Sequence, residues 1–157
     1  MRIRDLWELT RREVENVRER GGRVVFTNGV FDIIHPGHVE VLKQARSLGD
    51  MLIVGINTDE SVRRLKGNLR PILTLEERMS IISSIRYVDA VVPFEEDTPY
   101  RLIEFLRPHV LVKGGDYRPE EVVGRDIVEE VVIIPLKEGI STSRIIERIR
   151  QRYCRAE

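Results

Sequence analysis

The feature that most constrains the fold is the stretch of residues 23–50, where an apolar run, a glycine loop and a helical pattern follow one another. Residues 24–26 are Val-Val-Phe, a short β-branched and aromatic run that is typical of a buried strand. Asn28-Gly29 is expected to end this strand, because glycine adopts turn dihedrals that other residues avoid. The stretch therefore predicts a strand, a glycine loop and a helix in that order.

The predicted helix begins beside two histidines. Pro36 suits a first helical turn, where its missing N–H costs no hydrogen bond. The apolar residues after it recur at helical spacing: Val39, Leu42, Ala45 and Leu48. The first N–H groups of a helix lack partners within it and carry partial positive charge, so they attract phosphate. His35 and His38 would add imidazole donors at the same place, which makes this helix start the first candidate for a functional site.

The rest of the chain alternates strand-like and helix-like segments. Four further apolar runs predict strands: residues 51–56, 88–92, 110–113 and 131–134. Pro93 is expected to end the third strand of the chain, and Ser141 to cap the last helix. Such alternation implies a parallel sheet. We expect an α/β fold, a Rossmann-like doubly wound parallel five-stranded sheet with helices on both faces. One domain would span residues 1–157, with residues 1–22 as an N-terminal helix packed on the core.

Polar residues follow several of the predicted strands. Thr27-Asn28, Asn57, Lys113-Gly114 and the Ser141 helix start each come after an apolar run. In an open parallel sheet, ligands bind outside the carboxyl ends of the strands, at the switch point. We therefore expect these segments to converge on one crevice although they are distant in sequence.

The composition excludes several function classes. Lys+Arg and Asp+Glu each number 26 among 157 residues, so no net charge draws the chain to nucleic acid or to an anionic membrane. The first residues lack the apolar region of a signal peptide, and no run is long enough to span a bilayer. The one cysteine, Cys154, cannot form an internal disulfide, which indicates a reducing, cytoplasmic compartment. The dinucleotide fingerprint and the P-loop lysine motif are both absent from the sequence.

The histidines also admit a second interpretation, as metal ligands completed by His109. Zinc sites use three or four ligands and a supporting shell, and no cysteine cluster lies near His35 or His38 in the sequence. His109 stands between Pro108 and Val110, directly before an apolar run, and is expected to be structural. Phosphate binding at a helix start needs no missing ligand, so nucleotide chemistry is favoured and no metal ligand is predicted.

Other candidate residues have a structural as well as a functional interpretation. Hydroxyls at a helix start, such as those of Ser141-Thr142-Ser143, are usually an ordinary N-cap. Lys66 and Arg70 lie on a charged segment of the kind that is usually solvated. The neighbouring Gly67 and Pro71 suggest instead a loop over the crevice.

Two acidic residues and one lysine belong to the same group of candidates. Lys113 and Asp116 flank a glycine pair after a strand, where glycines let the backbone approach a ligand closely. Asp32 follows the loop after the first strand and is a candidate for binding substrate hydroxyls. Residue type alone does not separate their roles.

Four blocks of sequence stand out in order along the chain. They are Thr27-Asn28-Gly29 with Phe31-Asp32, His35-Pro36-Gly37-His38, Lys113-Gly114-Gly115-Asp116-Tyr117 and Glu138-Gly139-Ile140-Ser141-Thr142-Ser143. Together they resemble the signature of the cytidylyltransferase-like nucleotidyltransferases. The chain is most similar to the heptose-1-phosphate adenylyltransferase family, often found as one half of a bifunctional ADP-heptose synthase. The resemblance covers residues 24–149, nearly the whole chain.

The resemblance implies roles for individual residues. His35 and His38 would contact the triphosphate and Lys66 would be the family's phosphate-binding lysine, so these three are the expected catalytic residues. Ser141-Thr142-Ser143 would form a second phosphate-binding block. The other expected nucleotide-binding residues are Thr27, Asn28, Gly29, Phe31, Gly37, Lys113, Gly114, Asp116 and Gly139. The expected substrate-binding residues are Asp32, Asn57 and Arg70.

The implied reaction is nucleotidyl transfer. An oxygen of a sugar 1-phosphate would attack the α-phosphate of ATP, with Mg²⁺ bridging the phosphates, to release pyrophosphate and form an ADP-sugar. The glycerol-phosphate cytidylyltransferases carry an arginine three residues before the glycine of their last motif. That position is Leu136 here, which resembles the heptose adenylyltransferases and predicts ATP over CTP. Residues 126–130 depart from the glycine-rich turn usual in the heptose family.

Several alternatives stay open. They are a cytidylyltransferase acting on glycerol 3-phosphate or a similar polyol phosphate, an FAD synthetase-like adenylyltransferase, and a non-catalytic nucleotide sensor. A sensor would dispense with some phosphate donors, whereas this chain keeps all of them. The expected partners are ATP and a sugar phosphate, with no nucleic acid and no membrane, and a homodimer is expected. Because the kinase half of the bifunctional enzyme is absent from the sequence, a sugar kinase acting upstream is expected to be a separate protein.

Overall fold

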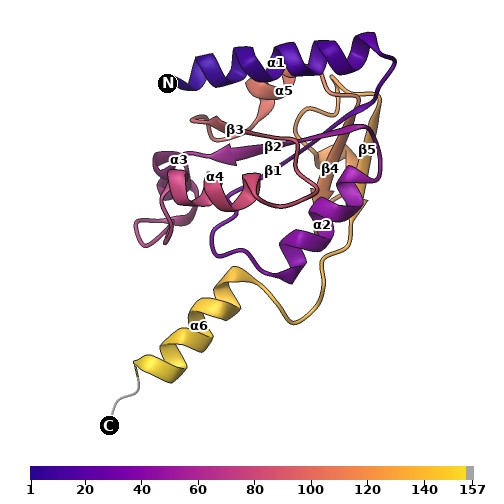
Figure 1. Ribbon diagram of the computed structural model, residues 1–157. Helices are drawn as coiled ribbons and strands as arrows, with labels where there is room; N and C mark the ends of the chain where they lie inside the picture. Colours follow the sequence, from indigo (N-terminus) through magenta and orange to yellow (C-terminus); the bar gives the residue numbers. More distant parts are fainter. Residues whose placement is uncertain (155–157) are drawn as a thin grey trace.

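Five parallel strands form the centre of the molecule. The computed structural model describes residues 1–154, and Figure 1 shows one sheet with helices above and below it. The strands stand in the order β3-β2-β1-β4-β5, and every pairing is parallel. Their bounds are β1 Val24–Gly29, β2 Met51–Asn57, β3 Ala90–Phe94, β4 Val110–Gly114 and β5 Glu130–Ile134. The predicted Rossmann-like α/β fold is confirmed.

Helices cover both faces of the sheet. In Figure 1, α1 and α5 lie above the strands, and α2 and α4 lie below them. The helix bounds are α1 Ile3–Glu19, α2 Pro36–Arg46, α3 Asp59–Lys66, α4 Leu75–Ser83, α5 Tyr100–Leu106 and α6 Thr142–Tyr153, with a 3₁₀ turn at Pro119–Glu121. Among the helices within residues 1–154, none combines the length and the apolar character needed to cross a membrane.

Alternate side chains of β1 enter two separate hydrophobic cores. Val24 and Phe26 belong to the cluster that contains Trp7 of α1, and Val25 belongs to the cluster that contains Leu42 of α2. All five side chains are at most 2% exposed. A strand buried on both faces reads as a continuous apolar run rather than an alternating one, which is why residues 24–26 predict a strand so clearly.

The N-terminal helix is part of this layered packing. Trp7, Thr10 and Val14 are its buried residues, and the indole Nε1 of Trp7 donates to the carbonyl of Pro93 at 2.8 Å. The indole N–H thus has a partner although the ring is fully buried, as a buried tryptophan requires. The contact ties α1 to β3, the edge strand.

One predicted strand end is wrong, and another differs from the prediction only in that the strand includes the two residues expected to end it. Pro93 does not end β3 but lies within it and pairs with Ile56 of β2. Proline is tolerated there because β3 is the edge strand, so one side of its backbone faces no further strand. β1 likewise continues through Asn28 and Gly29, because its pairing with β2 extends to Ile56. The loop that carries the histidines therefore starts at Val30, directly after this glycine.

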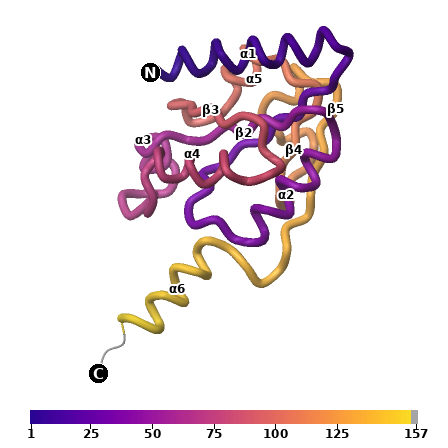
Figure 2. Tube along the Cα trace, viewed as in Figure 1, coloured from indigo at the N-terminus to yellow at the C-terminus, as the bar shows by residue number. Residues whose placement is uncertain are grey.

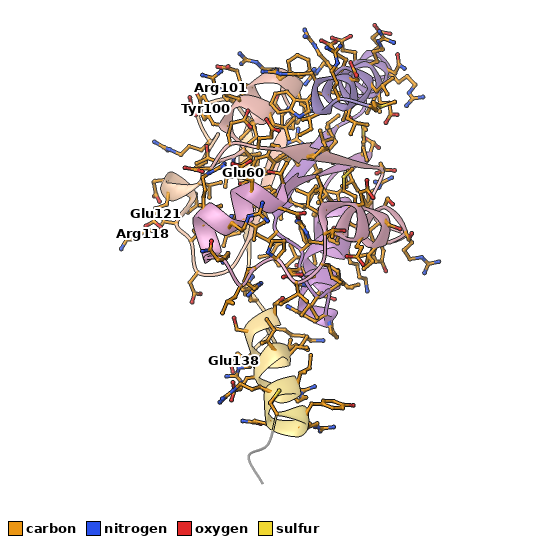
Figure 3. The ribbon with its side chains drawn as sticks, turned by 90° about the vertical axis from the view of Figure 1, so that its left-hand side faces the viewer. Glu60, Tyr100, Arg101, Arg118, Glu121 and Glu138 are labelled. Atoms are coloured by element: carbon orange, nitrogen blue, oxygen red, sulfur yellow. The ribbon has the colours of Figure 1, made fainter. Side chains whose placement is uncertain are left out.

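The last helix, α6, stands apart from the body of the molecule. Figure 2 traces a long connection from β5 into α6, and α6 is still clear of the sheet after the 90° turn of Figure 3. Every side chain of α6 is at least partly exposed, and Ile149 on its apolar face is 48% exposed. The start of this helix nevertheless reaches the carboxyl edge of the sheet, where the candidate site lies.

Candidate active site

A cavity of about 350 Å³ opens at the carboxyl ends of β1 and β4. Its walls come from the end of β1 and the loop after it, the start of α2, the segment after α3, and the segment between β5 and α6. Most of the site residues predicted from the sequence line it: Thr27, Asn28, Gly29, Phe31, Asp32, His35, Gly37, His38, Lys66, Arg70, Gly114, Ser141, Thr142 and Ser143. The convergence expected at the strand ends is therefore observed.

His35 and His38 form a reciprocal cap at the start of α2, with their ring centroids 3.8 Å apart. The Nδ1 atom of His35 accepts a hydrogen bond from the backbone N–H of Gly37 at 3.1 Å. The Nδ1 atom of His38 accepts one from the backbone N–H of His35 at 3.3 Å. A neutral imidazole that accepts at Nδ1 carries its proton on Nε2. Both rings therefore present an Nε2–H donor on the side away from the cap.

The histidine rings are neutral in the free protein near pH 7. Burial lowers the pKa of His35 below its ordinary value. Burial, together with the neighbouring His35, lowers the pKa of His38 to about 4. A negative phosphate beside the rings would raise both pKa values, because opposite charge favours the imidazolium form. The two rings would therefore gain a proton more readily when negative charge arrives or develops in the cavity.

Close packing fixes where the two rings lie. The ring of Phe31 packs against His38 with centroids 5.5 Å apart. At Gly37 an added Cβ would lie 2.8 Å from Cε1 of His35, so only glycine lets that ring fold over the helix start. At Gly29 an added Cβ would lie 3.1 Å from the Phe31 ring. The two glycines therefore serve the close approach of aromatic rings.

The start of α6 forms another wall of the cavity. Ser141 is the N-cap, and its Oγ accepts from the backbone N–H of Arg144 at 3.1 Å, as predicted for a cap. The Thr142 hydroxyl donates to the carbonyl of Asp32 at 2.6 Å. Ser143 lines the cavity with an exposed side chain. The hydroxyl proton of Ser141 and the hydroxyl of Ser143 are placed to donate toward a ligand.

Lys66 and Arg70 bring positive charge to the cavity. Lys66 is the last residue of α3 rather than a loop residue, which corrects the interpretation of its Gly and Pro neighbours, and Arg70 lies in the loop that follows. The Nε atom of Arg70 donates to Oδ2 of Asp32 at 3.0 Å. That ion pair is sheltered, because the Asp32 side chain is 0% and the Arg70 side chain 18% exposed.

Four predicted site residues do not line the cavity. Asn57 is buried, and its Nδ2 donates to the Oγ of Ser61 at 3.0 Å. Lys113 lies over the ring of Tyr117, and burial together with the charge of Lys66 lowers its pKa. Asp116 is exposed and Gly139 occupies a turn with φ 85°. None of these four residues contacts the cavity.

The three histidines do not meet. His109 directly precedes β4, at the amino ends of the strands and so away from the cavity. Its Nδ1 accepts from the backbone N–H of Val24 at 2.9 Å. Within the described part of the chain, residues 1–154, no group of three or more His, Cys, Asp or Glu side chains has the arrangement of a metal site. The structural role predicted for His109 is therefore confirmed.

Five residues that line the cavity were not among the predicted site residues, although the sequence had pointed to Leu136 as the position that bears on the choice of base: Val30, Val41, Leu136, Lys137 and Ile140. Most of them are aliphatic, and aliphatic side chains give no chemical signal in a sequence. For two of them the sequence did offer a signal, which is their place beside a recognised motif. Lys137 adjoins the block at residues 138–143, and Ile140 lies inside it. Leu136 approaches Gly114, whose added Cβ would lie 3.1 Å from it.

The fold and the site together define a class of protein. One cavity is surrounded by parallel strand ends, two helix starts, two imidazole donors and the three cationic side chains of Lys66, Arg70 and Lys137. Such features suit the binding and the reaction of a phosphorylated nucleotide. Residues 26–148 match the family described as cytidylyltransferase-like, and the chain belongs to this family. It is therefore a nucleotidyltransferase.

Proteins similar to this chain come from several bacteria. It is 53% identical over 152 residues to the bifunctional protein HldE of Syntrophotalea carbinolica, which covers 94% of this chain and 31% of the relative. It is 55% identical over 136 residues to HldE of a Nitratiruptor species, covering 87% of this chain and 29% of the relative. The chain thus spans about a third or less of the length of these curated relatives.

One solved structure supports the fold assignment. It is the crystal structure of the lipopolysaccharide core biosynthesis protein from Thermoplasma volcanium, with a TM-score of 0.64 and 28% sequence identity. The match covers 75% of this chain and the whole of that protein.

Proposed function

We propose that this nucleotidyltransferase transfers AMP from ATP to a sugar 1-phosphate of the heptose 1-phosphate kind, releasing pyrophosphate and forming an ADP-sugar. The observation that carries the proposal is the cavity at the ends of β1 and β4, where the histidine pair faces the start of α6. The similarity of the chain to proteins named HldE and the resemblance to heptose-1-phosphate adenylyltransferases support the choice of acceptor.

The triphosphate would lie between the two helix starts. The Nε2–H groups of His35 and His38 and the free N–H groups of α2 approach it from one side. The hydroxyls of Ser141 and Ser143 approach it from the other. As pyrophosphate leaves, negative charge grows on the oxygens these donors face, so they stabilise the transition state more than the ground state. Positioning and charge neutralisation then suffice, and no covalent nucleophile is required.

The two sides of the cavity differ in chemistry. Lys66 ends α3 and Arg70 lies in the loop after it, on one side of β1, whereas Gly114 belongs to β4, and Leu136 and Lys137 follow β5, on the other. The side with Lys66 and Arg70 suits the phosphate of the acceptor, which must approach the α-phosphate with its own negative charge neutralised. On the other side, the aliphatic surface of Leu136 suits the flat face of a base, and Lys137 adds one positive charge beside it.

Mg²⁺ fits this site as an ion that enters with ATP. Mg²⁺ usually keeps several waters and binds through substrate phosphates rather than through a protein cage. The one carboxylate in the cavity lining, that of Asp32, is already engaged by Arg70 and by backbone N–H groups. Bound Mg²⁺ would neutralise charge on the phosphates, while the histidines and the α6 start orient them.

Pyrophosphate release tests the proposed reaction. The purified protein is incubated with ATP, Mg²⁺ and a panel of sugar 1-phosphates and polyol phosphates, and pyrophosphate and nucleotide-sugar are measured. Release that depends on a sugar 1-phosphate supports the proposal. In parallel reactions, release only from CTP with a polyol phosphate would favour the cytidylyltransferase alternative, and FAD formed from ATP and added FMN would favour the FAD synthetase alternative. ATP binding without any release would favour the nucleotide sensor.

A competition between ATP and CTP tests the choice of base. Leu136 stands where the glycerol-phosphate cytidylyltransferases have an arginine, so we expect ATP to be preferred by about tenfold in kcat/KM, which one or two hydrogen bonds to a base edge can supply. The family description itself is cytidylyltransferase-like, so CTP is the second candidate. Preferential incorporation of CMP would overturn the assignment of ATP.

The acceptor also implies an earlier reaction. A sugar 1-phosphate arises by phosphoryl transfer to a sugar, so we propose that a sugar kinase supplies it. The homodimer expected from the sequence remains a proposal too, and light scattering of the purified protein tests it.

A further inference from the structure

Asp32 is the most completely engaged polar side chain of the site. Its side chain is fully buried, and its Oδ2 accepts from Nε of Arg70 at 3.0 Å and from the N–H of Ile72 at 2.7 Å. Its Oδ1 accepts from the N–H of Leu73 at 3.0 Å. A carboxylate with these three donors has little capacity left for a substrate hydroxyl. The expectation that Asp32 binds substrate directly therefore does not fit the geometry.

Three segments of the cavity wall meet at Asp32. The residue lies in the loop between β1 and α2, its carboxylate holds the segment that carries Arg70, and its backbone carbonyl accepts from the Thr142 hydroxyl at 2.6 Å. The flanking residues Phe31 and Ile33 have φ values of 53° and 55°, a left-handed conformation that is unfavourable for a residue other than glycine. The fold maintains this strained loop with Asp32 at the junction.

The hydrogen bond to Asp32 fixes the orientation of the Arg70 guanidinium. A guanidinium is a rigid planar fork, so fixing Nε also fixes the plane and direction of the two terminal nitrogens. Among residues 1–154 those terminal nitrogens have no hydrogen-bond partner, and Arg70 lines the cavity. Asp32 therefore holds one edge of the guanidinium and leaves the other edge for a ligand.

We propose that Asp32 is a positioning residue that aims Arg70 at the phosphate of the sugar phosphate acceptor. This inference rests on the proposed function, because the acceptor is what gives Arg70 a ligand. A lysine at position 70 would reach either Asp32 or the acceptor phosphate, since an ammonium is a single point of charge. Arginine serves both at once through its Nε atom and its terminal nitrogens.

A double-mutant cycle tests the proposal. The variants are Asp32→Asn, Arg70→Lys and the double variant, with Asp97→Asn as the matched control, because Asp97 also accepts from an arginine Nε, that of Arg64, at 2.9 Å but away from the cavity. The measurements are KM for the acceptor, the Kd of ATP by calorimetry and the thermal unfolding midpoint. We expect each single variant to raise the acceptor KM at least about tenfold, as a misplaced ligand does. The double variant should be no worse than either single one.

The ATP measurement separates positioning from general damage to the fold. If Asp32 acts through Arg70, the Kd of ATP should change by less than about twofold while the acceptor KM rises. An unchanged acceptor KM in Asp32→Asn would overturn the proposal. So would additive effects in the double variant, or an equal loss of ATP affinity.

Two further measurements cover the cases in which Asp32→Asn does not fold or no sugar phosphate reacts. If Asp32→Asn does not fold, Asp32→Glu keeps the charge but displaces the guanidinium by one methylene, and the same rise in acceptor KM is expected. The wild-type turnover with the sugar phosphate panel tests the proposed function by itself. If no panel member reacts, inorganic phosphate binding to the ATP-bound protein is measured instead. Weaker phosphate binding in both single variants then supports the role of Asp32, and equal binding refutes it.

Discussion

The two helix starts that face each other across the cavity are built in opposite ways. The start of α2 belongs to a helix that the core holds in place, with Gly37, Val41, Leu42 and Ala45 buried against the sheet. The start of α6 belongs to a helix with no buried side chain, and both Figure 1 and Figure 3 show it standing clear of the body. Its firmest described tie to the rest of the site is the Thr142 hydroxyl on the Asp32 carbonyl.

From this difference we expect a preformed half of the site and a half that depends on its ligand. An isolated helix as short as α6 is marginal in water, because nucleation is unfavourable and little burial offsets it. The histidine half is held by the capping hydrogen bonds of α2, whereas the Ser141 half is expected to gain order when phosphate bridges the two. Variants on the α2 side should therefore damage catalysis most, and variants on the α6 side should act mainly on binding.

The largest expected effect is the loss of either histidine. His35→Ala and His38→Ala should each lower turnover at least about a hundredfold, because each removes a donor placed for the developing charge on phosphate. Steady-state kinetics and far-UV circular dichroism check activity and fold. The control is His109→Ala, which removes a histidine at the amino ends of the strands and should leave turnover intact. Near-parental turnover in either site variant would contradict the assignment.

Acid should destabilise the preformed half through His38. Its pKa is lowered from 6.5 to about 4 in the folded state, so between these values the unfolded chain binds the proton first. The contribution of the neutral ring is complete above about pH 7 and is lost as the pH falls toward 4, by about 2 kcal/mol after allowance for the exposed ring edge. Urea unfolding at several pH values measures the loss. His38→Gln should flatten this part of the profile, and an unchanged profile would refute the prediction.

Gly37→Ala should separate catalysis from stability on the same side. The added Cβ would lie 2.8 Å from Cε1 of His35, so the ring must move, while alanine itself favours the helix. We expect turnover to fall about tenfold with the unfolding midpoint kept or raised, since a shifted donor loses its alignment. Kinetics and thermal unfolding give the two readings. Unchanged turnover would show that the position of the His35 ring is not critical.

The smallest effects are expected at Ser141. Ser141→Ala should cost about 1 kcal/mol as a lost cap, whereas Ser141→Gly should cost only a few tenths and so isolates any loss of ATP binding. Hydrogen exchange gives the matching structural measurement: ATP should protect the amides of residues 141–144 more than those of residues 36–38. If Ser141→Gly binds ATP like the parent and ATP protects no amide there, α6 is a structural helix and the comparison of the two halves fails.

Much of the fold could be read from local pattern. Residues 24–26 predict β1 because a strand covered on both faces must be apolar throughout, and Ser141 caps the last helix as predicted. The errors lie where tertiary contacts override local preference. Pro93 remains inside β3 because the strand is at the edge, a position that no local pattern reveals.

The residue types of the site could be predicted from the sequence, but the contacts between them could not. The histidines, the Ser141 block and Arg70 carry recognisable residue types, and the parallel sheet brings them to one cavity. Val30 and Val41 line the same cavity without any such signal. Arg78 was also passed over, although it is fully buried and its guanidinium donates to the carbonyls of Val30 and Asn57 and to Asp59.

The sequence by itself determined the order of strands and helices and the two helix starts of the candidate site, because these depend on short-range periodicity, capping and glycine. Only the tertiary structure decided which polar groups meet a ligand and which meet each other. Asp32 and Asn57 have the residue types of ligand-binding groups, yet their side chains are satisfied inside the protein, by Arg70 with two backbone amides and by Ser61. A hydrogen bond depends on distance in space, and partners dozens of residues away along the chain, such as Arg70 for Asp32, are set by the packing of the whole sheet.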